Sequence, residues 1–297
     1  MKGLYDQSFN RNIGNLTKAD QRQLRETSIV FAGTGGVGGT ALVNIARMGV
    51  GEVKIADPET FAYSDINRQQ GATIDTVGRK KVEVLTELVQ SINPDIKVTA
   101  YGNGLSEENV TDFLERASIV IDGLEFFCMA IRKKLYDQAR DLGIYVLSSP
   151  IFGFGTSLAV FSPTGPTFED FFGPIPGELD LNFTVNYGRS FFPKFPRYID
   201  IAAYFEAMKE NRPIPSFTTS CALSGAVTAA EAIFILLHKR DPVCFPFVRR
   251  FDLHEASAHI EDSRKKSPGS LTKLVLKVLF KIKKPRNISG EILEQLI

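Results

Sequence analysis

A glycine-rich turn is the stretch of this sequence whose residue types point most directly to chemistry. It follows an apolar, β-rich run at residues 29–32 and precedes a helix-compatible segment at residues 40–48. Glycines let the backbone turn sharply and approach a phosphate, which then lies at the positive end of the helix. The turn therefore predicts a βαβ unit that binds a nucleotide, and its glycines are Gly33, Gly35, Gly36 and Gly38.

A carboxylate follows at the spacing that such a unit uses for the sugar. The predicted strand Val53–Ala56 ends at Asp57. That is roughly twenty residues past the turn, where these folds place a carboxylate on the ribose hydroxyls. The turn and Asp57 alone fit NAD as well as ATP.

Basic and amide side chains beyond Asp57 favour ATP. Asn67, Arg68 and Gln69 belong to a loop at residues 58–77, and Lys80-Lys81 opens the next predicted helix. A loop of this length between a strand and a helix is usually functional. Arginine and lysine at these places suit a triphosphate, which carries more charge than the diphosphate of NAD.

These motifs, together with Ile92-Asn93-Pro94-Asp95, resemble the ThiF/MoeB/HesA family, the bacterial relatives of ubiquitin-activating enzymes. That family adenylates a carboxylate, commonly the C-terminus of a small protein or peptide. The resemblance implies attack of a substrate carboxylate on the α-phosphate of ATP, which gives acyl-AMP and pyrophosphate. It places Asn67 and Arg68 on the phosphates, with Arg68 stabilising charge during the attack, and puts Lys81 at the family's lysine position.

The resemblance also implies a homodimer that shares its ATP sites. In the family, an arginine of an upstream Arg-Gln pair reaches into the site of the other subunit. The matching position here is Arg11, followed by Asn12 where the family has glutamine. A solvated surface arginine is the equally weighted alternative.

Two carboxylates are candidates for holding Mg²⁺. The predicted strand Ser118–Asp122 ends in a carboxylate, and the carboxyl end of a parallel strand is where ligands bind. Asp122 and Glu125 stand where the family has Asp-x-x-Asp, a region whose aspartate helps hold magnesium. Glutamate at the second place departs from the pattern, and both residues remain candidates.

The three cysteines, Cys128, Cys221 and Cys244, form no C-x-x-C pair. The family's two zinc-binding C-x-x-C pairs are thus missing, and we expect no structural zinc. Free cysteines favour a reducing cytoplasm. Cys221 opens an apolar helix predicted at residues 220–237, where the helix N-terminus would lower the pKa of the thiol. Packing of a small buried residue is favoured over a nucleophilic role.

The expected fold is a Rossmann-like, doubly wound α/β domain with a mostly parallel sheet and antiparallel strands in its second half. We assign residues 1–260 to one ThiF-like ATP-binding domain. Within it, residues 173–215 are rich in proline, glycine and aromatic residues, and the resemblance implies that they cover the adenylate and receive the acyl substrate. A short helix is predicted at residues 199–209.

Residues 261–297 are predicted to form a basic amphipathic C-terminal tail. Its lysines fall on one helical face, opposite an apolar face. Such a helix binds an anionic membrane or an acidic partner, or docks on its own protein. Docking is the favoured interpretation. The net charge of +1 for 297 residues gives no case for nucleic-acid binding.

Two other functions remain open. An NAD(P)-dependent oxidoreductase would use the same glycine turn, although Arg68 and Lys81 argue against it. A non-catalytic nucleotide-binding module would keep the fold and recruit a partner. Asn12 and Glu125 depart from the family's pattern, which is consistent with this alternative.

Overall fold

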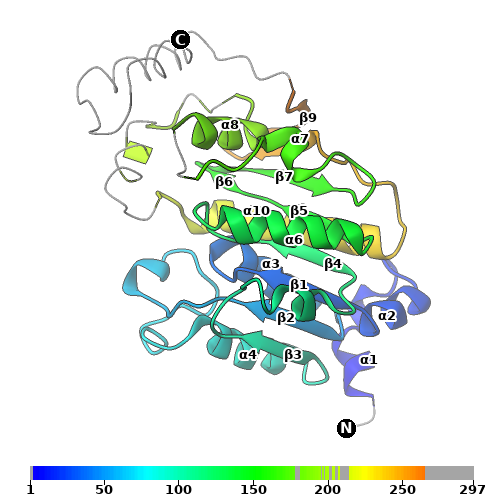
Figure 1. The fold of residues 1–297 in the computed structure, drawn as a ribbon. Helices are drawn as coiled ribbons and strands as arrows, with labels where there is room; N and C mark the ends of the chain where they lie inside the picture. Colours follow the sequence, from blue (N-terminus) through cyan, green and yellow to red (C-terminus); the bar gives the residue numbers. More distant parts are fainter. Residues whose placement is uncertain are drawn as a thin grey trace.

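The computed structural model describes residues 3–177, 181–194, 196, 198–200, 203–204, 207 and 214–264. They form one nine-stranded mixed sheet in the order β3-β2-β1-β4-β5-β7-β8-β9, with β6 paired to β7. Figure 1 shows the sheet running the length of the molecule, with helices on both faces. The predicted doubly wound α/β fold is confirmed.

The first half of the sheet is parallel because each strand returns through a helix on one face. Its strands are β1 (Ser28–Ala32), β2 (Glu52–Ala56), β3 (Lys97–Tyr101), β4 (Ile119–Asp122) and β5 (Tyr145–Ser148). β1 and β4 are buried along their whole length. Strands covered on both faces read as continuous apolar runs, as these do.

Helices on the two faces enclose two separate cores. One core packs under α3 (Gly36–Arg47), α4 (Lys81–Ile92) and α10 (Thr218–Leu236). The other packs under α5 (Val110–Leu114), α6 (Met129–Asp141), α7 (Phe168–Phe172) and α8 (Leu181–Phe191). The N-terminal segment adds α1 (Leu4–Ser8), η1 (Asn10–Asn12) and α2 (Lys18–Arg25). Thr17 and Asp20 form a capping box that starts α2.

The second half of the sheet is antiparallel. β6 (Ile151–Phe152) and β7 (Gly155–Phe161) form one antiparallel hairpin, and β8 (Phe247–Asp252) and β9 (Ser257–Asp262) form another. The two hairpins are far apart in the chain and join where β7 pairs antiparallel with β8. β7 also pairs antiparallel with β5 and so joins the two halves. The predicted antiparallel strands in the second half of the domain are therefore confirmed.

The aromatic segment after residue 172 is more helical than the sequence indicated. Its prolines and glycines favoured loop, but α8 forms because Phe183, Tyr187 and Phe191 recur every four residues and pack around Phe172. The short helix predicted at residues 199–209 falls mostly outside the described residues. The predicted boundary at residue 261 is wrong, because Glu261 and Asp262 end β9 as part of the sheet. The rest of the predicted tail, from residue 265 onward, lies outside the described residues.

α10 is the one helix in the described part of the chain with the length and apolar composition of a membrane span. It packs against α3 and β7. A Cβ at Gly225 would lie 2.5 Å from Thr40 Cγ2, so glycine allows α10 and α3 to approach closely.

Candidate functional site

The carboxyl ends of β1, β2 and β4 meet at one edge of the sheet, beside the N-terminus of α3. Gly33 has a φ of +87°, and a Cβ there would lie 2.3 Å from the carbonyl oxygen of Gly123. A Cβ at Gly38 would lie 2.1 Å from the oxygen of Gly33. Only glycine fits where the backbone at residues 33 and 38 packs this closely. No side chain caps the N-terminus of α3, so its first amides are suited to bind an anion.

Asp57 is buried at the end of β2 and braces the glycine turn. One of its carboxylate oxygens accepts bonds from the Thr34 amide, at 2.8 Å, and from the Thr34 hydroxyl, at 3.1 Å. The other accepts the Glu59 amide at 3.0 Å. The structure therefore brings Asp57 to the turn, as predicted from its spacing.

The loop after β2 gathers its polar side chains around one carboxylate, Asp65. Gln69 Nε2 donates to Asp65 Oδ1 at 2.7 Å. Arg68 Nη2 lies 3.7 Å from Oδ1, and Lys81 Nζ lies 3.9 Å from Oδ2. Asp65 ends the short helix η2 (Tyr63–Asp65) and is itself buried. Asp65 thus places a guanidinium and an ammonium side by side.

Lys81 is held inside the protein rather than on its surface. Its side chain is 3% exposed, and Nζ donates to Glu59 Oε2 at 2.5 Å. The neighbouring Lys80 points elsewhere, toward the carbonyl oxygen of Gly102. The structure therefore places Lys81, and not Lys80, with Arg68.

Arg68 and Asn67 are fixed by the surrounding backbone. Arg68 Nη1 donates to Ser64 O at 2.9 Å and to Asn67 Oδ1 at 3.0 Å. Asn67 Nδ2 donates to Ser216 O at 2.9 Å, which ties this loop to the segment just before α10. Both side chains are therefore oriented before any ligand binds.

Asp122 is fully engaged in a buried ion pair. Its Oδ2 accepts Arg132 Nε at 2.9 Å and the Tyr136 hydroxyl at 2.8 Å, while Oδ1 accepts the Leu124 amide at 3.0 Å. Burial alone would lower the pKa of the Arg132 guanidinium, but attraction to Asp122 raises it overall. Asp122 and Arg132 together brace the turn that carries Glu125.

Glu125 reaches solvent, in contrast to Asp122. Partial desolvation raises the pKa of its carboxyl, repulsion from Glu59 adds to the rise, and attraction to Lys81 and Arg68 opposes it. These interactions place Glu125 in the same charged neighbourhood as the basic pair. Within the described residues no three His, Cys, Asp or Glu side chains are arranged to hold a metal ion.

Arg11 lies away from this neighbourhood. Its neighbour Asn12 donates to Met48 O, just past the C-terminal end of α3. A helix of twelve residues is about 18 Å long, and the glycine turn is at the other end of α3. Arg11 is exposed on the surface and does not share an edge of the sheet with Arg68.

Cys221 packs under the glycine turn rather than facing solvent. It is 1% exposed, and a Cβ at Gly36 would lie 2.7 Å from its sulfur. Desolvation raises the pKa of the thiol to about 11, although Arg68 partly offsets the rise. The expected lowering by the helix N-terminus is wrong because burial outweighs it. Packing is the role that this environment supports.

Glu59 and Asp65 are the residues of this site that sequence reasoning did not select. Their signal was present, because Asp65 precedes Arg68 and Gln69 by three and four residues, the spacing of neighbours on one helical turn. Glu59 follows Asp57 by two residues at the end of β2. An acid is needed where a buried ammonium, Lys81, lies beside a partly enclosed guanidinium, Arg68.

These features define a Rossmann-like nucleotide-binding protein. The glycine turn lies at a helix N-terminus, a carboxylate follows the next strand, and a basic pair lies at the same edge of the sheet. The model of the ThiF family matches residues 9–271. The chain therefore belongs to the ThiF family.

Its relatives include several adenylyltransferases. The sulfur carrier protein adenylyltransferase of Thermus thermophilus is 30% identical over 217 residues, which cover 73% of this chain and 72% of that protein. The tRNA threonylcarbamoyladenosine dehydratase of Haemophilus influenzae is 37% identical over 123 residues, which cover 41% of this chain and 47% of that protein. The chain thus spans about half of the latter.

The fold is also that of Escherichia coli MccB. The crystal structure of MccB with MccA-N7isoASN superposes with a TM-score of 0.66 at 16% identity, over 87% of this chain and 72% of that chain. At this identity the likeness concerns the fold alone.

Proposed function

We propose that this protein is an ATP-dependent adenylyltransferase. It activates the carboxylate of a peptide or small protein, at the C-terminus or on a side chain, as acyl-AMP and releases pyrophosphate. The observation that carries the proposal is the pair Arg68 and Lys81, held by Asp65 beside the uncapped N-terminus of α3. Two fixed cations and an open helix end suit a triphosphate whose α-phosphate is attacked.

Each residue then has a physical role. The turn glycines receive the phosphates, and Asp57 offers its remaining lone pairs to the ribose. Gln69 Oε1 is buried and accepts no hydrogen bond from the described residues, so it can accept one from the bound nucleotide. Arg68 stabilises the charge that develops on the α-phosphate, and Lys81 neutralises the leaving pyrophosphate.

Glu125 fits magnesium better than Asp122 does. Magnesium in nucleotide sites is held by one or two carboxylates together with phosphate oxygens and waters, and Glu125 reaches solvent beside the cations. Asp122 has both oxygens engaged by Arg132, Tyr136 and backbone. When bound, the ion would neutralise phosphate charge.

We also propose a compartment, an oligomeric state and a substrate class for the protein. We place the protein in the cytoplasm, where its three free thiols are stable. We also propose a homodimer, because Arg11 reaches a nucleotide site only from a second subunit. Relatives named for sulfur carrier proteins, and the MccB–MccA structure, support a polypeptide substrate.

Thermal unfolding with separate ligands tests the proposal. A ligand at a hundred times its Kd stabilises the native state by about 2.7 kcal/mol. We expect Mg-ATP to raise the Tm, while NADH and NADPH leave it unchanged, and pyrophosphate exchange to follow once a carboxylate substrate is supplied. A rise with NADH or NADPH instead would replace the proposal by the oxidoreductase. Binding of ATP without exchange for any polypeptide carboxylate would favour the non-catalytic module.

A further inference from the structure

The antiparallel half of the sheet brings a second group of side chains to the edge that carries the glycine turn. β5 runs parallel to β4 and ends at this edge. β7 begins there, and Gly155 pairs with Asp252 at the end of β8. The turn at residues 153–154 and the β8–β9 turn at residues 253–256 therefore both lie on the nucleotide side of the sheet.

Side chains on these turns meet two aromatic residues from other segments, Tyr198 and Phe217. We call the group the aromatic platform: Phe154, Tyr198, Phe217, Leu253 and His254. Tyr198 stacks on His254 with ring centroids 4.0 Å apart, and Phe154 meets Phe217 edge-on at 4.6 Å. Phe154 is 40% exposed and Leu253 is 53% exposed. The platform thus presents apolar surface to solvent while its members already contact one another.

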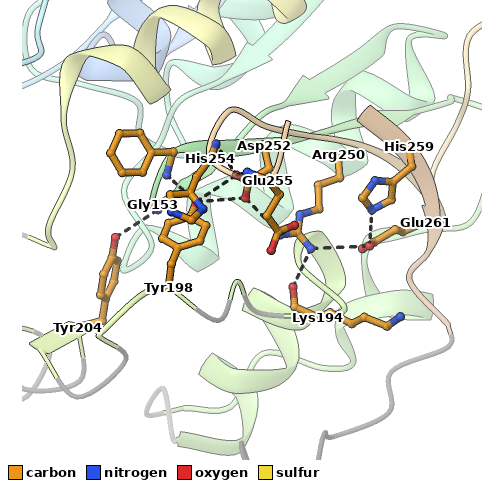
Figure 2. A network of polar contacts seen from close by, with 11 residues as sticks. Gly153, Lys194, Tyr198, Tyr204, Arg250, Asp252, His254, Glu255, His259 and Glu261 are labelled. Carbon is orange, nitrogen blue, oxygen red and sulfur yellow. Dashed lines mark hydrogen bonds and ion pairs between the residues drawn. The ribbon is translucent and has the colours of Figure 1, made fainter. Parts of the chain in front are cut away.

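A buried carboxylate, Asp252, joins Tyr198 and His254 of the platform to Arg250 in one polar network, as Figure 2 shows. Asp252 accepts the Tyr198 hydroxyl and the amides of His254 and Glu255, and pairs with Arg250. The Tyr198 hydroxyl in turn accepts the Phe154 amide at 2.9 Å. Desolvation is the main reason that the pKa of Tyr198 rises to about 12, so the hydroxyl remains a donor. A surface held this way loses little freedom on binding.

The platform is continuous with the candidate nucleotide site. Phe217 follows Ser216, whose carbonyl oxygen accepts the bond from Asn67. Between β4 and β8 lie three strand spacings, about 14 Å at roughly 4.8 Å each. From β1 the distance is about 19 Å. An extended chain covers that span in roughly four to six residues.

We propose that the aromatic platform binds an apolar side chain of the polypeptide substrate, four to six residues before the carboxylate that is adenylated. This inference rests on the proposed function. The substrate tail lies extended along the carboxyl edge of the sheet, with its terminal carboxylate beside Arg68. The platform then contributes to the choice of substrate without taking part in the reaction.

Labelled eight-residue peptides test the placement directly. The probes are glycine–serine peptides with a free C-terminus that carry one phenylalanine at each position in turn. Their binding is followed by fluorescence polarisation without ATP, so the measurement is independent of catalysis. We expect phenylalanine four to six residues from the C-terminal carboxylate to tighten binding roughly tenfold, as burial of one aromatic side chain does.

Matched variants locate the effect on the protein. Phe154→Ser/Leu253→Ser, or Leu253→Ser alone if the double variant is unstable, should abolish the positional preference. Leu142→Ser is the control, because Leu142 is 57% exposed and lies between α6 and β5, at the opposite edge of the sheet. It should keep the preference unchanged.

Three results would overturn the inference: no measurable binding, no positional preference, or a preference that survives in the platform variants. A change of oligomeric state in the platform variants would also overturn it, since a second copy would then cover the surface. Pyrophosphate exchange with the same peptides separates the two proposals. A platform-dependent preference without exchange contradicts adenylation alone, whereas exchange without the preference contradicts the platform alone.

Discussion

At the scale of single residues, the candidate site is a set of buried charges that compensate one another. Lys81 is almost fully enclosed yet lies between Glu59 and Asp65, and Asp65 also accepts Gln69 and faces Arg68. A lone buried ammonium would lose its proton or destabilise the fold. A bound triphosphate offers these cations new anionic partners, so binding exchanges ion pairs instead of creating buried charge.

The change Arg68→Ala should abolish adenylation while leaving the fold intact. Arg68 is only partly enclosed and its ion pair with Asp65 is loose, at 3.7 Å, so stability should change little. Loss of one preorganised charge costs about 100- to 1,000-fold in rate. Pyrophosphate exchange measures the loss of activity, and thermal unfolding measures stability. Arg116→Ala is the control, because Arg116 lies on the loop before β4, at the end of the strand opposite to the candidate site. Unchanged exchange in Arg68→Ala would contradict the site assignment.

Neutralising Asp122 should mainly reduce stability, whereas neutralising Glu125 should mainly reduce activity. Asp122→Asn leaves the Arg132 guanidinium buried without its charge partner, which destabilises a fold by about 3–5 kcal/mol. Glu125→Gln removes a carboxylate that reaches solvent, so stability should stay within about 0.5 kcal/mol while exchange is lost. Urea unfolding and exchange assays on both variants give the comparison. A stable Asp122→Asn protein that has lost its Mg²⁺ dependence would instead assign the metal to Asp122.

At the scale of elements, the strands of the parallel half of the sheet were predictable from the sequence, whereas the internal structure of the connecting segments was not. The runs that became β1 and β4 are mainly apolar, that of β2 alternates, and glycine or aspartate stands at the carboxyl end of each, so both their position and their ligand side were predictable. The loop after β2 was recognised as functional, but its internal order depends on Asp65 bonding forward to Gln69 and across to Lys81. Such contacts arise only when the chain folds back on itself, and α8 likewise depends on packing against Phe172.

The packing of α10 on α3 predicts how Cys221 will react. Burial raises the pKa of its thiol from 9.0 to about 11. At a pH below 9, the fraction of Cys221 present as the reactive thiolate is therefore roughly a hundredfold smaller in the native protein than in the unfolded chain. Iodoacetamide at pH 8 should therefore label Cys221 at least that much more slowly in the native protein than in urea. Mass spectrometry of the cysteine peptides measures both rates. Rapid native labelling of Cys221 would restore it as a candidate nucleophile.

At the scale of the whole molecule, one edge of a single sheet carries both the candidate nucleotide site and the aromatic platform. Parallel strands bring the nucleotide residues there, and the switch to antiparallel pairing at β7 brings the aromatic platform to the same side. The sequence predicted antiparallel strands in the second half from short apolar runs separated by glycine- and proline-rich turns. It did not reveal the platform, because Phe154, Tyr198 and His254 are far apart in the chain and meet only through the register of β7 with β8.

The position of Arg11 makes a prediction about assembly. Arg11 lies at the opposite end of α3 from the glycine turn, so the catalytic role proposed for it requires a second subunit. A heterodimer of an Arg11→Ala subunit and an Arg68→Ala subunit, purified through two different tags, then contains one intact site. It should show about half of the wild-type exchange activity, although each variant alone is inactive. The mirrored control pairs a wild-type subunit with an Arg11→Ala/Arg68→Ala subunit and should be inactive, since its only Arg68 lacks an Arg11 from the partner. Half activity in this control and none in the first heterodimer would mean that Arg11 acts within its own subunit, while full activity of Arg11→Ala would leave it a solvated surface residue.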